Sequence, residues 1–289
     1  MTTKSIHLEG KTCLVTGANA GIGRETSLAL ADMGAEVIMS ARNQTQAEDV
    51  RSEIIEATGN SKVHLIVADL SKPEEVVELS NQVKASWAKL DVLVNNAGIF
   101  VTDYQENHLG IEVQWMVNHL APYLLTRRLL SMLKLAPDAR IINVSSNAHL
   151  NGKINFEDLN GKTNYRGLTA YAQSKLANVL FTKSLASRLK GTRVSSFAMH
   201  PGVVNTSIGN KNNHSWISWV WSLGKPFMIS AKKGSETITY LATAADLGGL
   251  NGLYFVKNQP YPSSELSHDA NLALKLWQVS EDLMKEYLE

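Results

Sequence analysis

Tyr171 and Lys175 are two side chains that could move a proton together. They stand four positions apart in a stretch that predicts a helix, so both lie on one face of it. A free tyrosine has a pKa near ~10, too high for efficient proton transfer at neutral pH. A neighbouring ammonium group stabilises the phenolate and lowers that pKa. The pair is therefore a candidate general acid/base, although this spacing occurs by chance in many helices and gains meaning only from its surroundings.

A glycine-rich turn follows the first apolar run of the chain, residues 11–16. Its sequence is Thr16-Gly17-Ala18-Asn19-Ala20-Gly21-Ile22-Gly23. Glycines allow a tight turn and let a ligand approach the backbone, because no Cβ stands in the way. The helix that starts here presents unpaired N–H groups and the positive end of its dipole, which suit a pyrophosphate. The turn therefore predicts a dinucleotide site, and an ordinary turn between strand and helix is the alternative.

The end of the second predicted strand indicates which dinucleotide. Many NAD-binding folds place Asp or Glu here to bind the ribose 2′-hydroxyl. This chain has Ser40, Ala41 and Arg42 instead. No carboxylate repels a 2′-phosphate, and a guanidinium could pair with one. We expect NADP(H), with Arg24 as a second candidate ligand for the phosphate. The alternative for Arg42 is a solvated charge.

Strands and helices alternate along most of the chain and must position these side chains. Apolar runs predict strands near 11–16, 36–41, 63–68, 91–94, 140–145, 193–199 and 253–256. Helical spacing predicts helices near 22–33, 45–57, 71–89, 109–135, 169–189, 230–243 and 268–288. Ser71 and Glu74 have the spacing of a capping box for the third of these helices. The alternation predicts a doubly wound α/β fold, with a parallel sheet covered by helices on both faces.

Composition narrows the function classes. The 289 residues carry 28 Lys+Arg against 27 Asp+Glu, a net charge of +1, which argues against a nucleic-acid partner. The one cysteine, Cys13, allows no internal disulfide, and the eight histidines lack metal-ligand spacing. No apolar run reaches the ~18 residues of a membrane span, and residues 1–11 lack the apolar core of a signal peptide. We expect a cytoplasmic protein without a bound metal.

Six motifs in order resemble the short-chain dehydrogenase/reductase family. The Gly-rich turn matches one, and the others are Asn95-Asn96-Ala97-Gly98, Asn118, Ser145-Ser146, Tyr171-x-x-x-Lys175 and Pro201-Gly202. The resemblance covers about residues 10–206. It implies one Rossmann-type domain over 1–289, with a substrate-lid elaboration near 203–230. It also implies a small-molecule substrate and leaves homo-oligomerisation open.

The finer resemblance is to the retinol dehydrogenase-like branch of that family. Three stretches carry it: Ile141–Leu150, Phe156–Gly161 and Ala170–Phe181. Ser146 and Tyr171 are 25 positions apart, more than in most of the wider family, so residues 150–169 resemble an insertion near the active site. Many members of the branch carry an N-terminal membrane anchor, and the polar N-terminal segment predicts none here.

The resemblance implies hydride transfer between a nicotinamide and a carbonyl or alcohol, with four catalytic residues. Tyr171 would exchange the proton, and Lys175 would lower the Tyr171 pKa and bind the ribose. Ser146, the second serine of its pair, would polarise the carbonyl, since alternation along a strand turns Ser145 the other way. Asn118 would hold a water in a proton relay. The alternative for Asn118 is a side chain that satisfies a helix backbone.

The resemblance also implies a set of cofactor contacts. Tyr171 and Lys175 belong to it, and the residues expected around the rest of the dinucleotide are Gly17, Asn19, Gly21, Ile22, Arg42, Asp69, Leu70, Asn95, Ala97, Gly98, Pro201, Gly202, Val203 and Thr206. Thr206 would reach the nicotinamide carboxamide. The alternative for Asp69 is a cap or turn residue.

An aromatic segment follows the Pro-Gly turn, where the family has its substrate lid. Its large side chains are Trp216, Trp219, Trp221, Phe227 and Met228. They suggest a bulky apolar substrate. Packing against the sheet and contact with a membrane surface are the alternatives. The sequence thus favours a reductase or dehydrogenase of lipophilic aldehydes, ketones or retinoid-like compounds. A carbon–carbon double-bond reductase and a catalytically silent NADP(H) sensor stay open.

Overall fold

A computed structural model describes residues 8–202, 229–245 and 247–289. Its described strands form one sheet in the order β3-β2-β1-β4-β5-β6-β7-β8, in which only β8 is antiparallel to its neighbour. The strands are β1 (Thr12–Thr16), β2 (Glu36–Ala41), β3 (Val63–Val67), β4 (Val92–Asn95), β5 (Ala139–Val144), β6 (Val194–Met199), β7 (Tyr254–Val256) and β8 (Gln259–Pro260). The predicted α/β class and the parallel, doubly wound sheet are confirmed.

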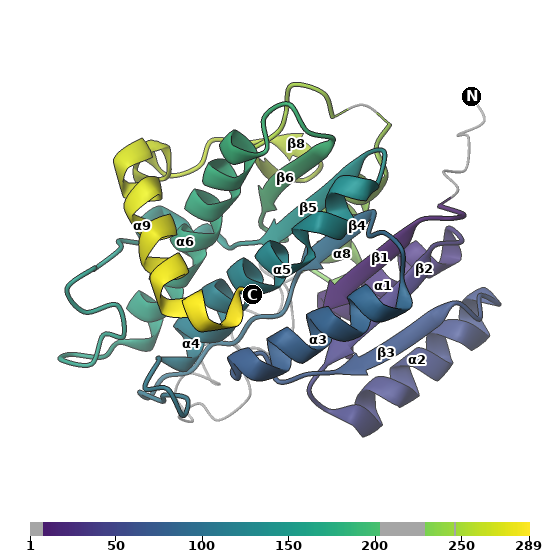
Figure 1. Cartoon of the computed structure of the whole chain (residues 1–289), viewed down its shortest axis with the longest axis horizontal. Coiled ribbons are helices and arrows are strands. Elements are labelled where there is room, and N and C mark those ends of the chain that lie inside the picture. Colours follow the sequence, from purple (N-terminus) through teal and green to yellow (C-terminus); the bar gives the residue numbers. More distant parts are fainter. Residues whose placement is uncertain (1–7, 203–228, 246) are drawn as a thin grey trace.

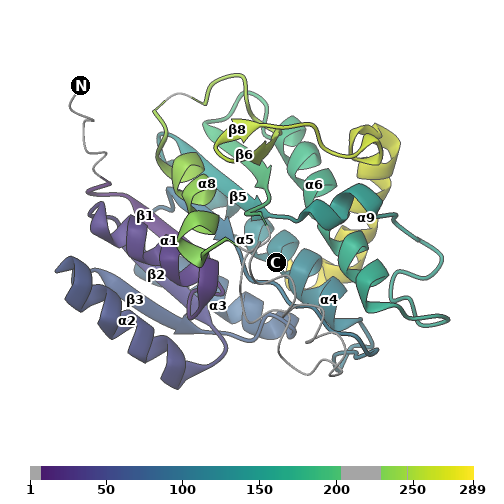
Figure 2. The same cartoon turned by 180° about the vertical axis from the view of Figure 1, so that it is seen from behind.

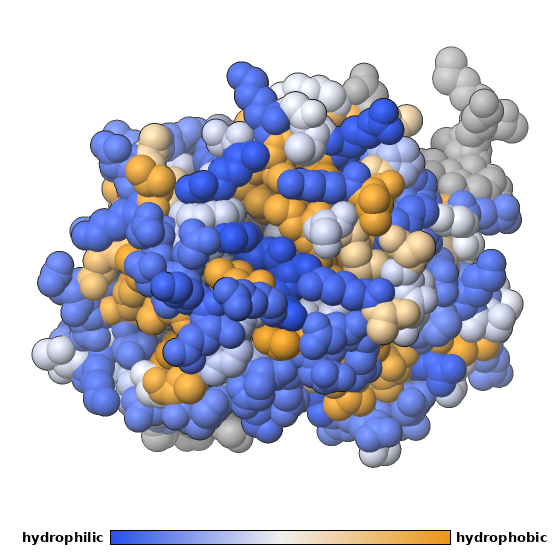
Figure 3. All heavy atoms as spheres, viewed as in Figure 1, coloured by the Kyte–Doolittle hydropathy of each residue, from blue (hydrophilic) through white to orange (hydrophobic). Residues whose placement is uncertain are grey.

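Helices cover both faces of the sheet. One face carries α3 (Pro73–Ser86), α5 (Ala121–Leu135) and α6 (Gly167–Arg188), with α9 (Ala270–Met284) packed against α6 (Figure 1). The other face carries α1 (Gly21–Asp32), α2 (Gln44–Thr58) and α8 (Ala231–Thr243) (Figure 2). The outward side of the first layer is mostly hydrophilic, as expected for amphipathic helices (Figure 3).

Alternation along the strands builds two apolar cores. On β1, Leu14 faces the α3, α5 and α6 layer, whereas Cys13 and Val15 face α1 and α8. All three side chains are fully buried. Parallel register also fixes where the strands end, because Thr16 pairs with Ser40 and Val15 with Val94. The turns after β1, β2 and β4 therefore leave the sheet together at one edge, which is where ligands bind in open α/β sheets.

The long helix predicted near 109–135 is interrupted. It starts as α4 (Val113–Trp115), continues as a π-helical turn over Met116–Leu120, and becomes α5. Such π-turns widen a helix locally and are frequent at functional sites. Asn118 lies within this turn, so its side chain leaves the helix in a direction that regular α-helical spacing does not give.

The capping box predicted from Ser71 and Glu74 is wrong. The helix α3 begins after Lys72, with Pro73 in its first turn, since proline has no N–H to satisfy and its fixed φ suits that position. Glu75, not Glu74, reaches back and accepts hydrogen bonds from the Asp69 N–H at 2.7 Å and the Lys72 Nζ at 2.8 Å.

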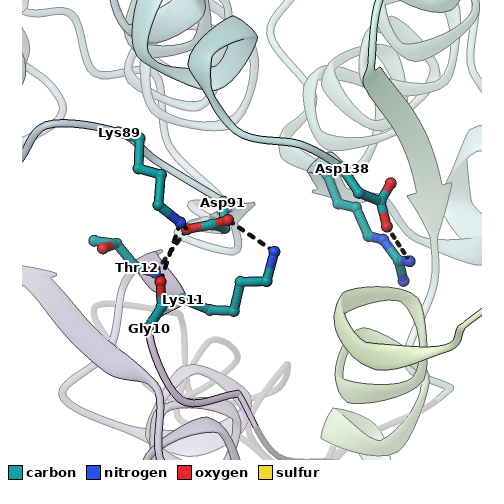
Figure 4. Close-up of polar contacts among 7 residues, drawn as sticks. Gly10, Lys11, Thr12, Lys89, Asp91 and Asp138 are labelled. Atoms are coloured by element: carbon teal, nitrogen blue, oxygen red, sulfur yellow. Dashed lines mark hydrogen bonds and ion pairs between the residues drawn. The ribbon is translucent and has the colours of Figure 1, made fainter.

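A buried carboxylate joins β1 to β4 at the sheet edge opposite the glycine turn (Figure 4). Asp91, with 1 % of its side chain exposed, accepts hydrogen bonds from Lys11 Nζ at 3.0 Å, Lys89 Nζ at 2.5 Å and the Thr12 N–H at 3.0 Å. Burial alone would raise the Asp91 pKa, but these three donors outweigh it and hold the pKa below its usual value.

We expect Asp91→Asn to lower the free energy of unfolding by about 1–3 kcal/mol at pH 7, because the variant leaves two lysines without their carboxylate. The loss should shrink as pH falls below about 4, where the carboxyl of the unfolded chain binds a proton first and Asp91 of the folded chain binds one only at lower pH. Urea unfolding at both pH values measures it. Asp138→Asn is the matched control: Asp138 pairs with Arg140 at 2.8 Å but is 58 % exposed, so its loss should cost below about 1 kcal/mol. Equal losses in the two variants would contradict this assignment.

Candidate active site

A cleft of about 480 Å³ opens at the edge where the strand ends converge. This volume lies in the range of small-molecule and cofactor sites. Five segments line it: the turn after β1, the end of β2 and the residues after it, those after β3, the loop after β4, and the start of the interrupted helix. The lining residues are Gly17, Asn19, Ala20, Gly21, Ile22, Gly23, Ser40, Ala41, Arg42, Asn43, Ala68, Asp69, Leu70, Ser71, Asn96, Ala97, Gly98, Ile99, Phe100, Val101, Gln105, Val113 and Val117.

The glycines of the turn are required by close packing against the loop after β4. A Cβ on Gly17 would lie 2.9 Å from Ala97 Cα, and one on Gly23 would lie 2.2 Å from the Gly17 carbonyl oxygen. Asn96 locks the two segments together, since its Nδ2 donates to the Thr16 carbonyl oxygen at 2.8 Å. The backbone can therefore form the floor of the cleft without side chains in the way.

The start of α1 faces this floor with open hydrogen-bonding capacity. Its N-cap, Ala20, makes no side-chain capping bond, and the first turn holds no acidic residue. The first N–H groups of the helix therefore stay available to an anion, and the dipole favours negative charge there. Both features suit the pyrophosphate expected from the sequence.

Arg42 and Arg24 take different positions. Arg42 is exposed at the wall of the cleft, and within the described part of the chain no carboxylate pairs with it. Arg24 is held by Glu25 at 2.6 Å and Glu53 at 2.9 Å and does not line the cleft. Arg42 is thus the cation that remains available to a phosphate at this wall.

Asn95, one of the expected cofactor contacts, is buried inside the sheet in the chain alone. Asn95 does not line the cleft: it is 2 % exposed, and its Nδ2 donates to Asn143 Oδ1 at 2.8 Å and Thr126 Oγ1 at 3.1 Å. Asn96 lines the cleft instead, because the chain leaves β4 after Asn95 and the next side chain turns outward. The sequence predicts that Asp69 either contacts the cofactor or stabilises a turn. It lines the cleft, and its Oδ1 also accepts the Ser71 N–H in a turn.

Tyr171 and Lys175 do not line the cleft themselves; they lie directly behind two residues that do, Phe100 and Gly98. Lys175 Nζ lies 5.5 Å from the Tyr171 ring centroid and donates to the Val144 carbonyl oxygen at 3.1 Å. A Cβ on Gly98 would lie 3.4 Å from Lys175 Nζ and 3.3 Å from Asn118 Oδ1. The absence of a side chain at Gly98 thus opens the cleft toward the Lys175 ammonium and the Asn118 amide.

The two serines that follow β5 have different partners, and their opposite orientation stays a prediction. Ser145 is buried, and its Oγ donates to the Lys175 carbonyl oxygen at 2.8 Å. Ser146 lies close enough to the Tyr171 phenol to oppose the rise of the Tyr171 pKa. Its Oγ also accepts the Ala148 N–H at 3.2 Å. The Ala148 N–H uses a lone pair of that oxygen and not its proton, so the Ser146 hydroxyl can still donate to a group in the site.

Asn118 is fully buried and holds the loop after β4. Its Oδ1 accepts the Ile99 N–H at 2.8 Å, and its Nδ2 donates to the Ile99 carbonyl oxygen at 3.0 Å and to Ser174 Oγ at 3.1 Å. The side chain therefore satisfies a loop backbone rather than a helix backbone. Its role in a water relay stays a prediction.

Burial sets the proton affinities of the acid/base pair. It raises the pKa of Tyr171, and Ser146 opposes that rise only in part. It lowers the pKa of Lys175 to about 8. The sequence predicts that Lys175 lowers the pKa of Tyr171. In the chain alone, the pKa of Tyr171 is instead raised, because burial has the larger effect. Phe100 contributes to this environment, since its ring meets the Tyr171 ring edge to face at 5.7 Å.

The cleft also has an apolar wall, which the sequence motifs do not indicate. Phe100, Val101, Val113 and Val117 form this part of its wall. Phe100 and Val101 closely follow the Asn-Asn-Ala-Gly motif, and this position is the sequence signal that could have indicated them. Val113 and Val117 lie at the start of the interrupted helix. Together they make a surface suited to an apolar substrate.

The last expected contacts lie near or beyond the end of β6. Pro201 and Gly202 do not line the cleft, and the Gly202 N–H donates to His200 Nδ1 at 3.0 Å. Val203, Thr206 and the aromatic residues Trp216, Trp219, Trp221, Phe227 and Met228 lie outside the described residues. In the described ranges, no helix is long and apolar enough to cross a bilayer, and no group of three or more His, Cys, Asp or Glu side chains is placed to hold a metal.

Known proteins resemble this chain over most of its length. A family model described as short chain dehydrogenase matches residues 11–216. Mouse retinol dehydrogenase 12 is 40 % identical over 282 residues, which cover 98 % of this chain and 89 % of that protein.

Solved structures share the fold. An uncharacterized protein from Mycobacterium paratuberculosis has a TM-score of 0.79 and 32 % identity, covering 97 % of this chain and 95 % of the other. An NAD(P)-dependent gluconate 5-dehydrogenase from Beutenbergia cavernae, so described and with bound NADP, has a TM-score of 0.69 and 28 % identity, covering 86 % of this chain and 95 % of the other.

Proposed function

The chain belongs to the short-chain dehydrogenase family, and from that premise we propose that it transfers a hydride between NADP(H) and the carbonyl or alcohol group of a lipophilic substrate. The observation that carries the proposal is that Ser146, Tyr171 and Lys175 lie together beside the cleft, behind Phe100 and Gly98. The family is one of oxidoreductases, and the relatives named above include a retinol dehydrogenase.

Two features of the cleft support NADP(H) as the cofactor. The glycine turn and the open N-terminus of α1 fit a pyrophosphate. Arg42, unpaired within the described residues, fits the additional 2′-phosphate. Bound NADP in the gluconate 5-dehydrogenase structure agrees with this choice. When bound, NADPH supplies the hydride.

The remaining chemistry falls to side chains of this protein. Reduction of a carbonyl develops negative charge on its oxygen, and a donor must meet that charge. The Ser146 hydroxyl, whose oxygen already accepts the Ala148 N–H, donates to the substrate oxygen. Tyr171 then gives its proton to the same oxygen, and its raised pKa keeps the phenol protonated at neutral pH for this step. The positive charge of the Lys175 ammonium stabilises the phenolate that forms when Tyr171 loses its proton.

The apolar end of the cleft supports a lipophilic substrate. Phe100, Val101 and Val113 offer it no charged partner. The proposal is tested by following NADPH consumption with retinal, steroids, aromatic ketones and aliphatic aldehydes. We expect turnover of at least one apolar carbonyl, whereas NADPH binding without turnover on the whole panel would favour the sensor. The predicted cytoplasmic location stays a prediction.

The reaction should depend on pH with opposite signs in its two directions. Reduction needs protonated Tyr171 and Lys175, so its kcat/KM should stay level through neutral pH and fall as Lys175 loses its proton near pH 8. Oxidation needs the Tyr171 phenolate and should speed up as pH rises. Initial rates measured in both directions from about pH 6 to 10 check this, and a reductive rate that climbs with pH would be inconsistent with Tyr171 as the acid.

A further inference from the structure

His149 is a buried imidazole outside the expected catalytic set, and both of its ring nitrogens are engaged. It is 0 % exposed. Nδ1 lies 2.7 Å from the Ser146 carbonyl oxygen, and Nε2 lies 3.1 Å from the Ser264 backbone nitrogen. The second contact joins positions 115 residues apart in the sequence.

These partners determine the protonation of the ring. A carbonyl oxygen can only accept, so Nδ1 must carry the proton. A backbone N–H can only donate, so Nε2 must keep its lone pair. The ring is therefore neutral and in one tautomer. Burial agrees with this state, because it lowers the pKa of His149 more than the Ser146 carbonyl raises it, and the charge of Lys183 adds to the lowering.

The Ser146 carbonyl oxygen depends on the His149 ring for one of its two hydrogen bonds. The residues after it form a 3-10 turn over Asn147–Asn151, and such turns have poorer hydrogen-bond geometry than α-helices. The Ser146 carbonyl accepts the His149 N–H at 3.0 Å within that turn, so the His149 side chain supplies its second bond. The rest of the ring packs against Tyr254 on β7, at 4.6 Å between centroids.

We propose that His149 is a positioning residue: its imidazole ties the Ser146 carbonyl to the Ser264 amide and so fixes the direction of the Ser146 hydroxyl. Fixing this carbonyl fixes the peptide plane that carries the Ser146 side chain. It thereby keeps the hydroxyl oxygen under the Ala148 N–H and its proton directed into the site. The effect on turnover rests on the proposed function, whereas the bridge itself does not.

Two substitutions separate the halves of the bridge. The asparagine amide sits where Nδ1 sits, so His149→Asn keeps a donor for the Ser146 carbonyl. The glutamine amide reaches the position of Nε2, so His149→Gln keeps only an acceptor for the Ser264 N–H. We expect His149→Gln to lower kcat by about 10-fold or more, and His149→Asn by about 3-fold or less, with NADPH affinity unchanged in both. Equal losses of kcat in the two variants would overturn the proposal.

A double-mutant cycle distinguishes positioning from a general loss of stability. If His149 acts through Ser146, His149→Gln should lower kcat no further in a Ser146→Ala background. A second, independent drop would overturn the proposal. Leu133→Ala is the matched control for destabilisation: Leu133 is fully buried in the last turns of α5, and its truncation should lower Tm while leaving kcat at 25 °C unchanged.

The tautomer of His149 can be determined without an activity measurement. Nitrogen chemical shifts of the wild-type histidines at pH 7 should show His149 with a protonated Nδ1 and an unprotonated Nε2. The opposite tautomer or a charged ring would overturn the bridge even if the variants fail to fold. If the wild type turns over no carbonyl while the tautomer is as expected, the proposed function fails and the bridge stands.

Discussion

Tyr171→Phe should lower kcat by about 10³-fold or more and leave NADPH affinity within about twofold of the wild type. The substitution removes the one phenolic proton placed against Ser146 and Lys175. It keeps the ring, so the edge-to-face contact with Phe100 and the wall of the cleft persist. Single-turnover reduction measures the chemical step, and titration of NADPH fluorescence measures binding.

Tyr123→Phe is the matched control for this variant. Tyr123 is also a buried tyrosine, and its hydroxyl accepts a bond from Arg127 at 2.7 Å on α5, away from the cleft. Its loss should change stability and leave kcat as it was. If Tyr171→Phe keeps more than about a tenth of the wild-type kcat, another group supplies the proton and the assignment of the acid is wrong.

Cofactor preference should reverse when the charge after β2 is changed. In Ala41→Asp/Arg42→Leu, we expect the NADPH/NADH ratio of kcat/KM to fall by about 100-fold or more. Removing Arg42 takes away a charge-assisted bond to the 2′-phosphate, and the new carboxylate repels that phosphate while accepting a bond from a ribose hydroxyl. Initial rates with both cofactors at fixed ionic strength give the ratio.

Arg24→Leu provides the comparison for this charge change. It removes a cation directly after the glycine turn, but this cation is already paired with Glu25 and Glu53. The ratio should therefore stay within about twofold of the wild type. A ratio that falls with Arg24→Leu and not with the Arg42 variant would move the 2′-phosphate site from Arg42 to Arg24.

Local patterns in the sequence predict the elements well. The strand predicted at 36–41 is β2 as found, and the helix expected from Ser230 is capped by that serine, whose Oγ accepts the Lys233 N–H. Asp269, near the start of the predicted last helix, caps α9, since its Oδ1 accepts the Asn271 and Leu272 N–H groups. These features depend on residues close in the sequence.

Features that depend on distant partners escape such patterns. The π-helical turn around Asn118 places its amide on the Ile99 backbone, and helical spacing alone does not reveal it. Asn95 and Asn96 look equivalent in the sequence, and only the end of β4 decides which one reaches the cleft. The short strand β8 is missed because its two residues, Gln259–Pro260, carry no apolar alternation. The bridge made by His149 has no sequence signal at Ser264.

The most direct test of the proposed reaction uses NADPH deuterated at the transferred position of the nicotinamide and a mixture of apolar aldehydes and ketones. If Ser146, Tyr171 and Lys175 reduce a carbonyl, mass spectrometry will find one deuterium on the carbinol carbon of the alcohol product, and Tyr171→Phe will abolish the transfer. Deuterium at an alkene carbon, or tight binding of the cofactor with no transfer to any substrate, would contradict the account.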